Sequence, residues 1–194
     1  MADLPFGFTV RVPESWYTFD VWRAGRGADL SRAVDARIAA APALKPHRPT
    51  LVRLLREVAD LAGRHGAVFG AAMTDMEEGA PAVIATLMAF HTSGDPDPAG
   101  NTVEAIASGV TAIAPSSDSP VWREVRIVEI PAGRAVRVRG VREDAVAMQT
   151  LVPVPGDEGV LDLVLTSPQH DLAEPMLDLF DAISATLAWS DPRS

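Results

Sequence analysis

The stretch that decides the fold spans residues 121–168 and reads VWREVRIVEIP (121–131), GRAVRVRGVRE (133–143), AVAMQTLVPVPG (145–156) and GVLDLVLTSP (159–168). Each segment is rich in Val, Leu or Ile, and proline and glycine residues at the joints favour tight turns. The pattern predicts a meander of consecutive antiparallel strands. The last segment alternates two sets of side chains: Leu161, Leu163 and Leu165 against Val160, Asp162 and Val164. Because successive strand residues point to opposite faces, the leucine face is built for a core.

A helix over residues 170–188 is predicted to cover this meander. Its apolar side chains recur at spacings of three and four residues, at Leu172, Met176, Leu179, Phe180, Ile183 and Leu187. This spacing places them along one stripe of an amphipathic helix. We therefore expect the stripe to pack on the sheet.

The rest of the chain adds further strands and helices. Strands are predicted over residues 6–12, 14–22, 67–76 and 82–91, and helices over 29–43, 50–66 and 101–113. The 82–91 strand is apolar on both faces, which indicates an inner position in the sheet. Grouped strands with helices before, between and after them indicate an α+β fold, a mainly antiparallel sheet sandwiched between helices. The length fits a single domain, 1–194, with a two-helix embellishment at about 29–66.

The composition excludes several kinds of site. The chain has no cysteine, so disulfides, thiol nucleophiles and cysteine metal sites are excluded, and its four histidines are far apart in sequence. We therefore expect no metal ion and no cofactor.

The N-terminus lacks the charged start and apolar run of a signal peptide, and no segment has the about 20 apolar residues of a membrane span. A cytoplasmic protein without a membrane span is the expectation.

The formal net charge of −9 is unevenly spread. Residues 1–66 carry +3 and residues 67–194 carry −12. Because the field of such a molecule repels phosphate groups, we expect no nucleic-acid partner.

No catalytic residue is predicted. The sequence has no Gly-x-Ser-x-Gly elbow. Adjacent acids occur next to three predicted turns, at Glu77-Glu78, Glu143-Asp144 and Asp157-Glu158. Adjacency does not make two carboxyls face one cavity, as general acid–base catalysis requires, so these pairs are interpreted as solubilising. The protein is predicted not to be an enzyme.

The strongest candidate site lies on the first two meander strands and comprises Trp122, Arg126, Arg137 and Arg139. Arg137 and Arg139 are two positions apart on one predicted strand, so they share a face. An array of guanidinium donors suits the carboxylates of an acidic helix or tail of a protein partner. The alternative is ordinary surface, on which Glu124 and Glu129 pair with the arginines across the strands.

A second candidate region is the aromatic segment near the N-terminus. It contains Trp16, Tyr17, Phe19 and Trp22. Aromatic side chains of this density are typical of a core beneath a covering helix. The alternative is a pocket between helix and sheet, fed by Trp16, Tyr17 and Trp22. Such a pocket would make the protein a small-molecule binder or an enzyme.

Both ends of the chain resemble the PsbP-like fold group. The opening FGFTVRVPESW (6–16) is similar to the first strand of that group, and VLTSP (164–168) with LFDAISATLAW (179–189) resembles its closing strand and helix. The resemblance implies an α/β/α sandwich and a binding function. Members include a photosystem accessory subunit, a nuclear-transport factor that binds a small GTPase, and chaperones that load secretion-system effectors. It therefore implies a non-catalytic protein-interaction module, such as an adaptor or secretion-associated chaperone. No functional residue carries over, because neither matching end is a site motif.

Overall fold

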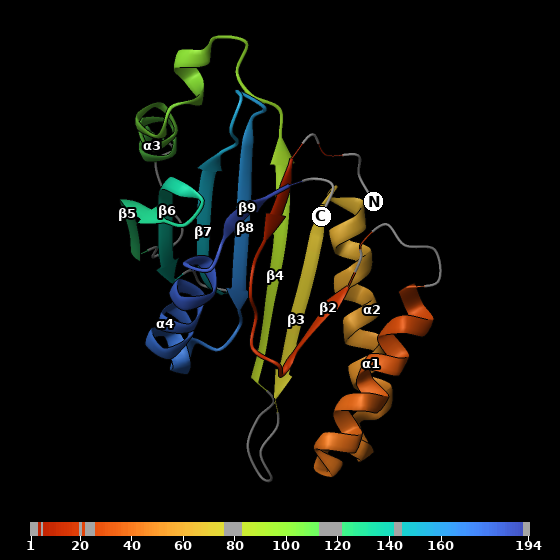
Figure 1. The fold of residues 1–194 in the computed structure, drawn as a ribbon. Helices are drawn as coiled ribbons and strands as arrows, with labels where there is room; N and C mark the ends of the chain where they lie inside the picture. Colours follow the sequence, from red (N-terminus) through yellow and green to blue (C-terminus); the bar gives the residue numbers. More distant parts are fainter. Residues whose placement is uncertain are drawn as a thin grey trace. The chain divides into compact units, whose positions relative to one another are not determined.

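The computed structural model describes residues 4, 6–19, 21, 26–75, 83–112, 122–141 and 145–191 (Figure 1). In this part of the chain the helices are α1 (Arg26–Ala40), α2 (Arg48–Arg64), α3 (Val103–Ala112) and α4 (Ala173–Ser184), with the 3-10 turns η1 (Pro42–His47), η2 (Pro98–Asn101) and η3 (His170–Leu172). The strands are β1 (Gly7–Thr9), β2 (Trp16–Phe19), β3 (Phe69–Asp75), β4 (Val83–Thr92), β5 (Trp122–Ile130), β6 (Gly133–Val141), β7 (Val146–Pro153), β8 (Val160–Ser167) and β9 (Ala188–Ser190).

Seven of these strands form one sheet in the order β2-β3-β4-β8-β7-β6-β5, and β1 pairs with β9. The predicted meander is confirmed, because β5, β6, β7 and β8 pair consecutively and antiparallel. The inner position predicted for the 82–91 strand is also confirmed, since β4 lies between β3 and β8. The protein is therefore an α+β protein with a mainly antiparallel sheet packed against helices.

The chain forms two compact units, one built mainly from Val12–Met88 and the other from Asp3–Arg11 and Ala89–Ser194. The division falls inside β4. The helices predicted as an embellishment, α1 and α2, belong to the first unit. The assignment of residues 1–194 to a single domain stays a prediction.

In the first unit the aromatic segment belongs to the core. Trp16, Tyr17 and Phe19 are all buried on β2. Phe19 lies directly opposite Gly70 of β3, and any side chain at Gly70 would collide with the Phe19 ring. A glycine in a strand leaves room for a neighbouring ring to cover it. The structure thus places Trp16 and Tyr17 in the core, while Trp22 lies outside the described residues.

In the second unit, helices cover both faces of the meander. One face presents Leu161, Leu163 and Leu165 to α4, which contacts β7 and β8 (Figure 1). The other face presents Val136 and Val138 to α3, whose buried residue is Val103; Ile106, Ala107, Val110, Val125 and Leu151 pack around them. Opposite faces receive different helices because strand side chains alternate with a period of two.

The predicted 170–188 helix is wrong in its extent and in part of its buried stripe. The helix ends at Ser184, and the chain continues into β9, where Ser190 pairs with Gly7. The buried side chains of α4 are Met176, Leu177, Phe180, Ile183 and Ser184. Leu179 is only half-buried and Leu172 lies in η3. These positions recur at helical spacing and form one face, so the contact surface is rotated toward Leu177 and away from Leu179. The predicted 6–12 strand is likewise shorter, and spans only Gly7–Thr9.

None of the helices in the described ranges is long and apolar enough to cross a bilayer.

Candidate functional site

Strand register brings the predicted arginines together. In the β5–β6 pair, Arg126 lies directly opposite Arg137, and Glu124 lies directly opposite Arg139. Directly opposed residues of antiparallel strands share a face, so these four side chains form one charged cluster. The face is the one that carries α4, since Arg137 contacts Asp181 of that helix.

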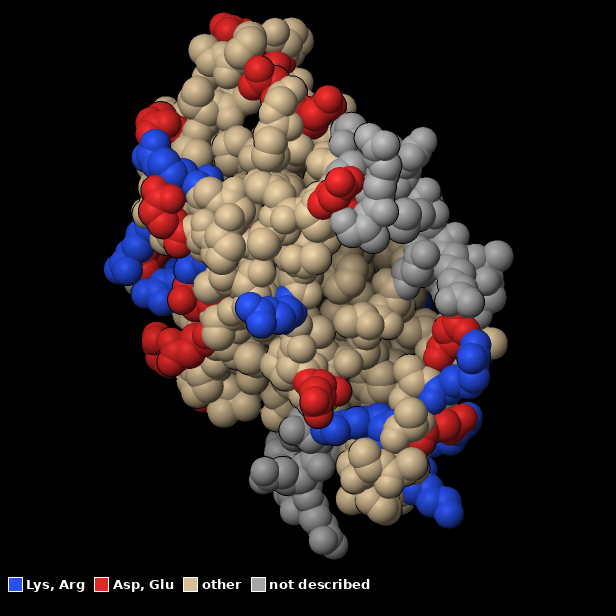
Figure 2. Space-filling model, in the orientation of Figure 1, with Lys and Arg blue, Asp and Glu red and all other residues tan. Residues whose placement is uncertain are grey.

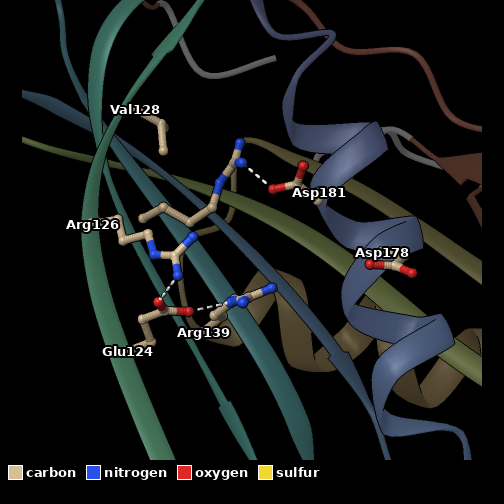
Figure 3. A pocket seen from close by; sticks show the side chains of 7 residues that line it. Glu124, Arg126, Val128, Arg139, Asp178 and Asp181 are labelled. Atoms are coloured by element: carbon tan, nitrogen blue, oxygen red, sulfur yellow. Dashed lines mark hydrogen bonds and ion pairs between the residues drawn. The ribbon is translucent and has the colours of Figure 1, made fainter.

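This cluster lines a pocket of about 170 Å³ between β5, β6 and α4 (Figure 3). We call it the arginine pocket, and its lining comprises Glu124, Arg126, Val128, Arg137, Arg139, Asp178 and Asp181. Asp178 and Asp181 lie three positions apart on α4, a spacing that puts both on one helix face. Figure 3 shows Asp181 on the side of the helix that faces the strand-borne arginines, with Asp178 farther along the same helix. Figure 2 shows acidic and basic side chains interspersed on the side of the molecule where β5, β6 and α4 lie. The predicted arginine stripe is therefore interleaved with carboxylates.

Glu124 holds two of the arginines. Its carboxylate accepts a hydrogen bond of 2.6 Å from Arg139 Nε and forms an ion pair with Arg126. The hydrogen bond from Arg139 lowers the pKa of Glu124, against the opposing effect of desolvation, and it raises the pKa of Arg139. Both groups are therefore held in their charged forms at neutral pH.

Arg137 is the buried member of the pocket and is only 8% exposed. Its Nη1 donates to Asp181, whereas its Nε and Nη2 are buried and have no acceptor among the described residues. Burial lowers the pKa of Arg137, while Asp181 raises it. A guanidinium nevertheless keeps its proton in proteins, so this is a buried cation with part of its hydrogen-bonding capacity unused.

The prediction that Glu129 pairs with the arginine cluster is wrong. Glu129 lies opposite Arg134 and contacts it at 3.6 Å on the other face of the sheet. Arg134 also donates to Glu104 of α3 at 2.7 Å. One residue of offset moves a side chain to the opposite face, which separates Glu129 from the pocket. Trp122 begins β5, and its side chain lies outside the described part of the chain.

The structure adds two charged pocket residues that sequence reasoning missed. Asp178 and Asp181 lie on the closing helix, and Asp181 is 44 positions away from Arg137. Their only local signal is a pair of acids at helical spacing on the polar side of the 170–188 segment. That signal is indistinguishable from a solvated helix face.

The opposite face of the meander carries a partly buried carboxyl group. Asp162 of β8 accepts a hydrogen bond of 3.3 Å from Gln149 Nε2 through Oδ2, and its Oδ1 is buried without a partner in the described structure. Desolvation raises the pKa of Asp162 to about 6, and the hydrogen bond from Gln149 acts in the opposite direction. The alternation that puts Asp162 opposite the leucines is confirmed.

The other acidic groups do not assemble into a site in the parts of the chain that the structure describes. Asp157 and Glu158 are exposed in the turn between β7 and β8. Glu77-Glu78 and Glu143-Asp144 lie outside the described residues. No three His, Asp or Glu side chains within the described ranges come together as metal ligands would. The expectation that the protein uses no cofactor stays a prediction.

Comparison with protein-family models and with curated proteins found no match. The resemblance to the PsbP-like fold group therefore rests on the quoted residues at the two ends and stays a prediction.

Proposed function

We propose that this protein is a non-catalytic protein-interaction module that binds an acidic segment of a partner at the arginine pocket. We propose that this module acts as an adaptor or secretion-associated chaperone, the role implied by the PsbP-like resemblance. The observation that carries the proposal is Arg137, a buried cation whose Nε and Nη2 have no acceptor among the described residues. Buried polar groups in folded proteins are nearly always hydrogen-bonded, so an exception in a pocket favours a ligand.

Binding is favoured over catalysis by the ionisation of the pocket. Glu124 is held as an anion by Arg139. General acid–base catalysis needs a group that exchanges its proton near the working pH, and neither an ion-paired glutamate nor an arginine does so. Among the described lining residues, no Ser, Thr, His or Lys is present to serve as a nucleophile.

The rim of the pocket suits a protein partner. The Arg126 side chain is 63% exposed, and Asp178 is exposed as well. Exposed charges at a rim act on the rate of encounter and on partner choice. A volume of about 170 Å³ is close to that of an engineered cavity of about 150 Å³ that takes up benzene. The pocket therefore accommodates one acidic head group, and the remainder of a partner segment would contact the rim.

The same volume supports a second candidate function, a small-molecule-binding protein with its pocket between helix and sheet. That pocket lies at α4 and not at Trp16 and Tyr17, which are core residues. A free carboxylic acid with few heavy atoms would fill it without needing the rim.

The test compares two charge reversals on the same strand pair. Arg137 is unsuitable because charge reversal of a buried ion-paired residue threatens the fold. We would immobilise the wild-type protein and the variants Arg126→Glu and Arg134→Glu. A cell lysate would be passed over each at low and at high salt, and the retained proteins would be identified by mass spectrometry. Arg134 is the matched control, since its side chain is 49% exposed and it lies on the other sheet face.

We expect the wild type and Arg134→Glu to retain the same protein at low salt, and Arg126→Glu to lose it. A peptide scan of the retained protein should map binding to an acidic segment, and high salt should release it from all variants. Retention that is equal in all three variants, or binding through a segment without acidic residues, would overturn the proposed function.

A further inference from the structure

The geometry of the unused Arg137 donors specifies one kind of ligand group. In a planar guanidinium, the Nε hydrogen and one Nη2 hydrogen point in the same direction along one edge. Nη1, on the far side, is already used by Asp181. The unused pair is thus a complete two-donor fork, whose spacing matches the two oxygens of a carboxylate.

Like charges across the strands add a reason for an anion at this point. Arg126 and Arg137 lie directly opposite each other, an arrangement that destabilises a strand pair. Glu124 compensates Arg126 from one side, and Asp181 compensates Arg137 from the other. An anion bound at the fork would add a third compensating charge, at the edge of Arg137 for which the described residues supply no acceptor.

The negative side chains of the pocket restrict which anion fits. Glu124, Asp178 and Asp181 surround the arginines, so the lining carries three formal positive and three formal negative charges. Residues 67–194 add a background of −12. A dianion such as phosphate meets about twice the attraction and about twice the repulsion that a carboxylate meets from this balanced lining, so discrimination against the dianion depends on the surrounding negative charge and on Asp178. Asp178 is the acidic lining residue for which the described structure shows no ion pair, so its charge acts on the ligand with the least compensation.

Access to the fork requires a movable side chain, because Nε and Nη2 are closed to solvent. Arg126 meets this requirement, since it is largely exposed and lies next to Arg137 across the strands. Its partner Glu124 is also bonded to Arg139, so Glu124 stays paired when Arg126 swings outward.

We infer that the arginine pocket is a carboxylate-specific site, in which Arg137 binds one carboxylate through Nε and Nη2 while Asp181 keeps Nη1, and Asp178 discriminates against dianions. The inference rests on the proposed function and names the group that the partner segment inserts, the carboxylate of a Glu or Asp side chain or of a chain terminus. Arg137 is the binding residue, and Asp178 is the specificity-determining one.

The experiment follows the Arg137 Nε–H signal in proton–nitrogen NMR spectra of the full chain. The probes are sodium acetate, the capped amino acid N-acetyl-glutamate amide, sodium phosphate and sodium chloride, at matched ionic strength. Arg137→Lys assigns the signal and keeps the charge without the fork. Arg134→Lys is the matched control on the same strand, and thermal unfolding of each variant checks that it is folded.

We expect acetate and the capped glutamate to shift the Nε–H signal saturably, phosphate to bind more weakly, and chloride to produce no saturable shift. In Arg137→Lys the amide signals of Val128 and Ala135 should no longer respond to acetate, whereas Arg134→Lys should behave as wild type. Asp178→Asn should improve phosphate binding roughly two- to fivefold relative to acetate, the range expected for one partly screened charge.

A wild type in which phosphate binds more tightly than acetate, or in which chloride has the same effect as acetate, would overturn the inference. So would an unshifted Nε–H signal at saturating capped glutamate. The outcome is separable from that of the proposed function. Acetate binding without a retained protein would refute the proposed function and leave the carboxylate site standing. Retention of a protein through Arg126 without carboxylate binding at Arg137 would refute the carboxylate site and leave the proposed function standing.

Discussion

On the meander face that carries α4, the buried charge is Arg137, which keeps an ion pair with Asp181. The face that carries α3 has a partly buried ionisable group, Asp162, whose Oδ1 is closed to solvent and whose neighbour is the neutral amide of Gln149. The difference follows from acid–base chemistry. A buried carboxyl escapes the cost of desolvation by taking up a proton, and burial raises the pKa of Asp162 to about 6. An arginine has no such route, so its burial requires an anion.

The two faces also differ in how completely their helices cover them. Leu177, Phe180 and Ile183 of α4 are buried, whereas α3 buries only Val103 in the described structure. Ile127, on the α3 face of β5, is 43% exposed. Low polarity around a charged group strengthens its electrostatic interactions, and the buried Arg137 of the arginine pocket lies on the well-covered face.

The largest expected effect comes from removing the main anchor of each helix. Phe180→Ala should lower the free energy of unfolding by about 3–5 kcal/mol, because a fully buried ring leaves a cavity under α4. Val103→Ala removes two buried methyl groups and should lower the free energy of unfolding by roughly 1.5 kcal/mol. Urea denaturation of both variants measures the difference. Leu179→Ala, at a half-buried position of α4, is the control and should cost less than Ile183→Ala. Equal losses for Phe180→Ala and Val103→Ala would contradict the unequal cover of the two faces.

A smaller effect should appear in the pH dependence of stability. The pKa of Asp162 rises from 3.8 to about 6 on folding, so between these values the folded state binds more protons and the free energy of unfolding falls as pH increases. The loss is complete above pH 6 and amounts to roughly 3 kcal/mol. Below pH 3.8 both states are protonated and the group contributes nothing.

Asp162→Asn should remove this fall, so the variant should become more stable than the wild type as pH increases from 4 to 7. Chemical denaturation at several pH values measures it. Asp171→Asn, at an exposed position of η3, is the matched control and should keep the wild-type profile. A wild-type curve that rises over this range while the Asp162→Asn curve runs parallel to it would show that Asp162 is not held neutral.

Removal of metal ions is expected to have no effect on stability. Addition of a chelator should leave the melting temperature unchanged, because the chain has no cysteine and no metal-ligand cluster occurs in the described ranges. Thermal unfolding with and without chelator is the measurement. A drop of several degrees would show that carboxylates of one face are held by a bound cation, which would change the interpretation of both buried charges.

Much of the fold was predictable because it depends on local periodicity. The period-two alternation of Leu161, Leu163 and Leu165 indicated a strand with one core face. The proline and glycine residues between the segments indicated tight turns and therefore a meander. The two-residue spacing of Arg137 and Arg139 indicated that they share a face. The part of the candidate site that lies on one strand was therefore predictable, whereas the part that another element contributes was not.

The sequence by itself determined where the meander strands and most of the other elements lie, and which side chains share a face within a strand. The tertiary structure alone decided which helix covers which face, how α4 is rotated so that Leu177 and not Leu179 is fully buried, and that Ser190 returns to pair with Gly7. It also decided that Arg137 is buried against Asp181 and that Asp162 is desolvated. Alternation and helical spacing are set by the backbone of a few neighbouring residues. Burial and ion pairing depend on which distant segments the packed chain brings into contact, and no local pattern encodes that choice.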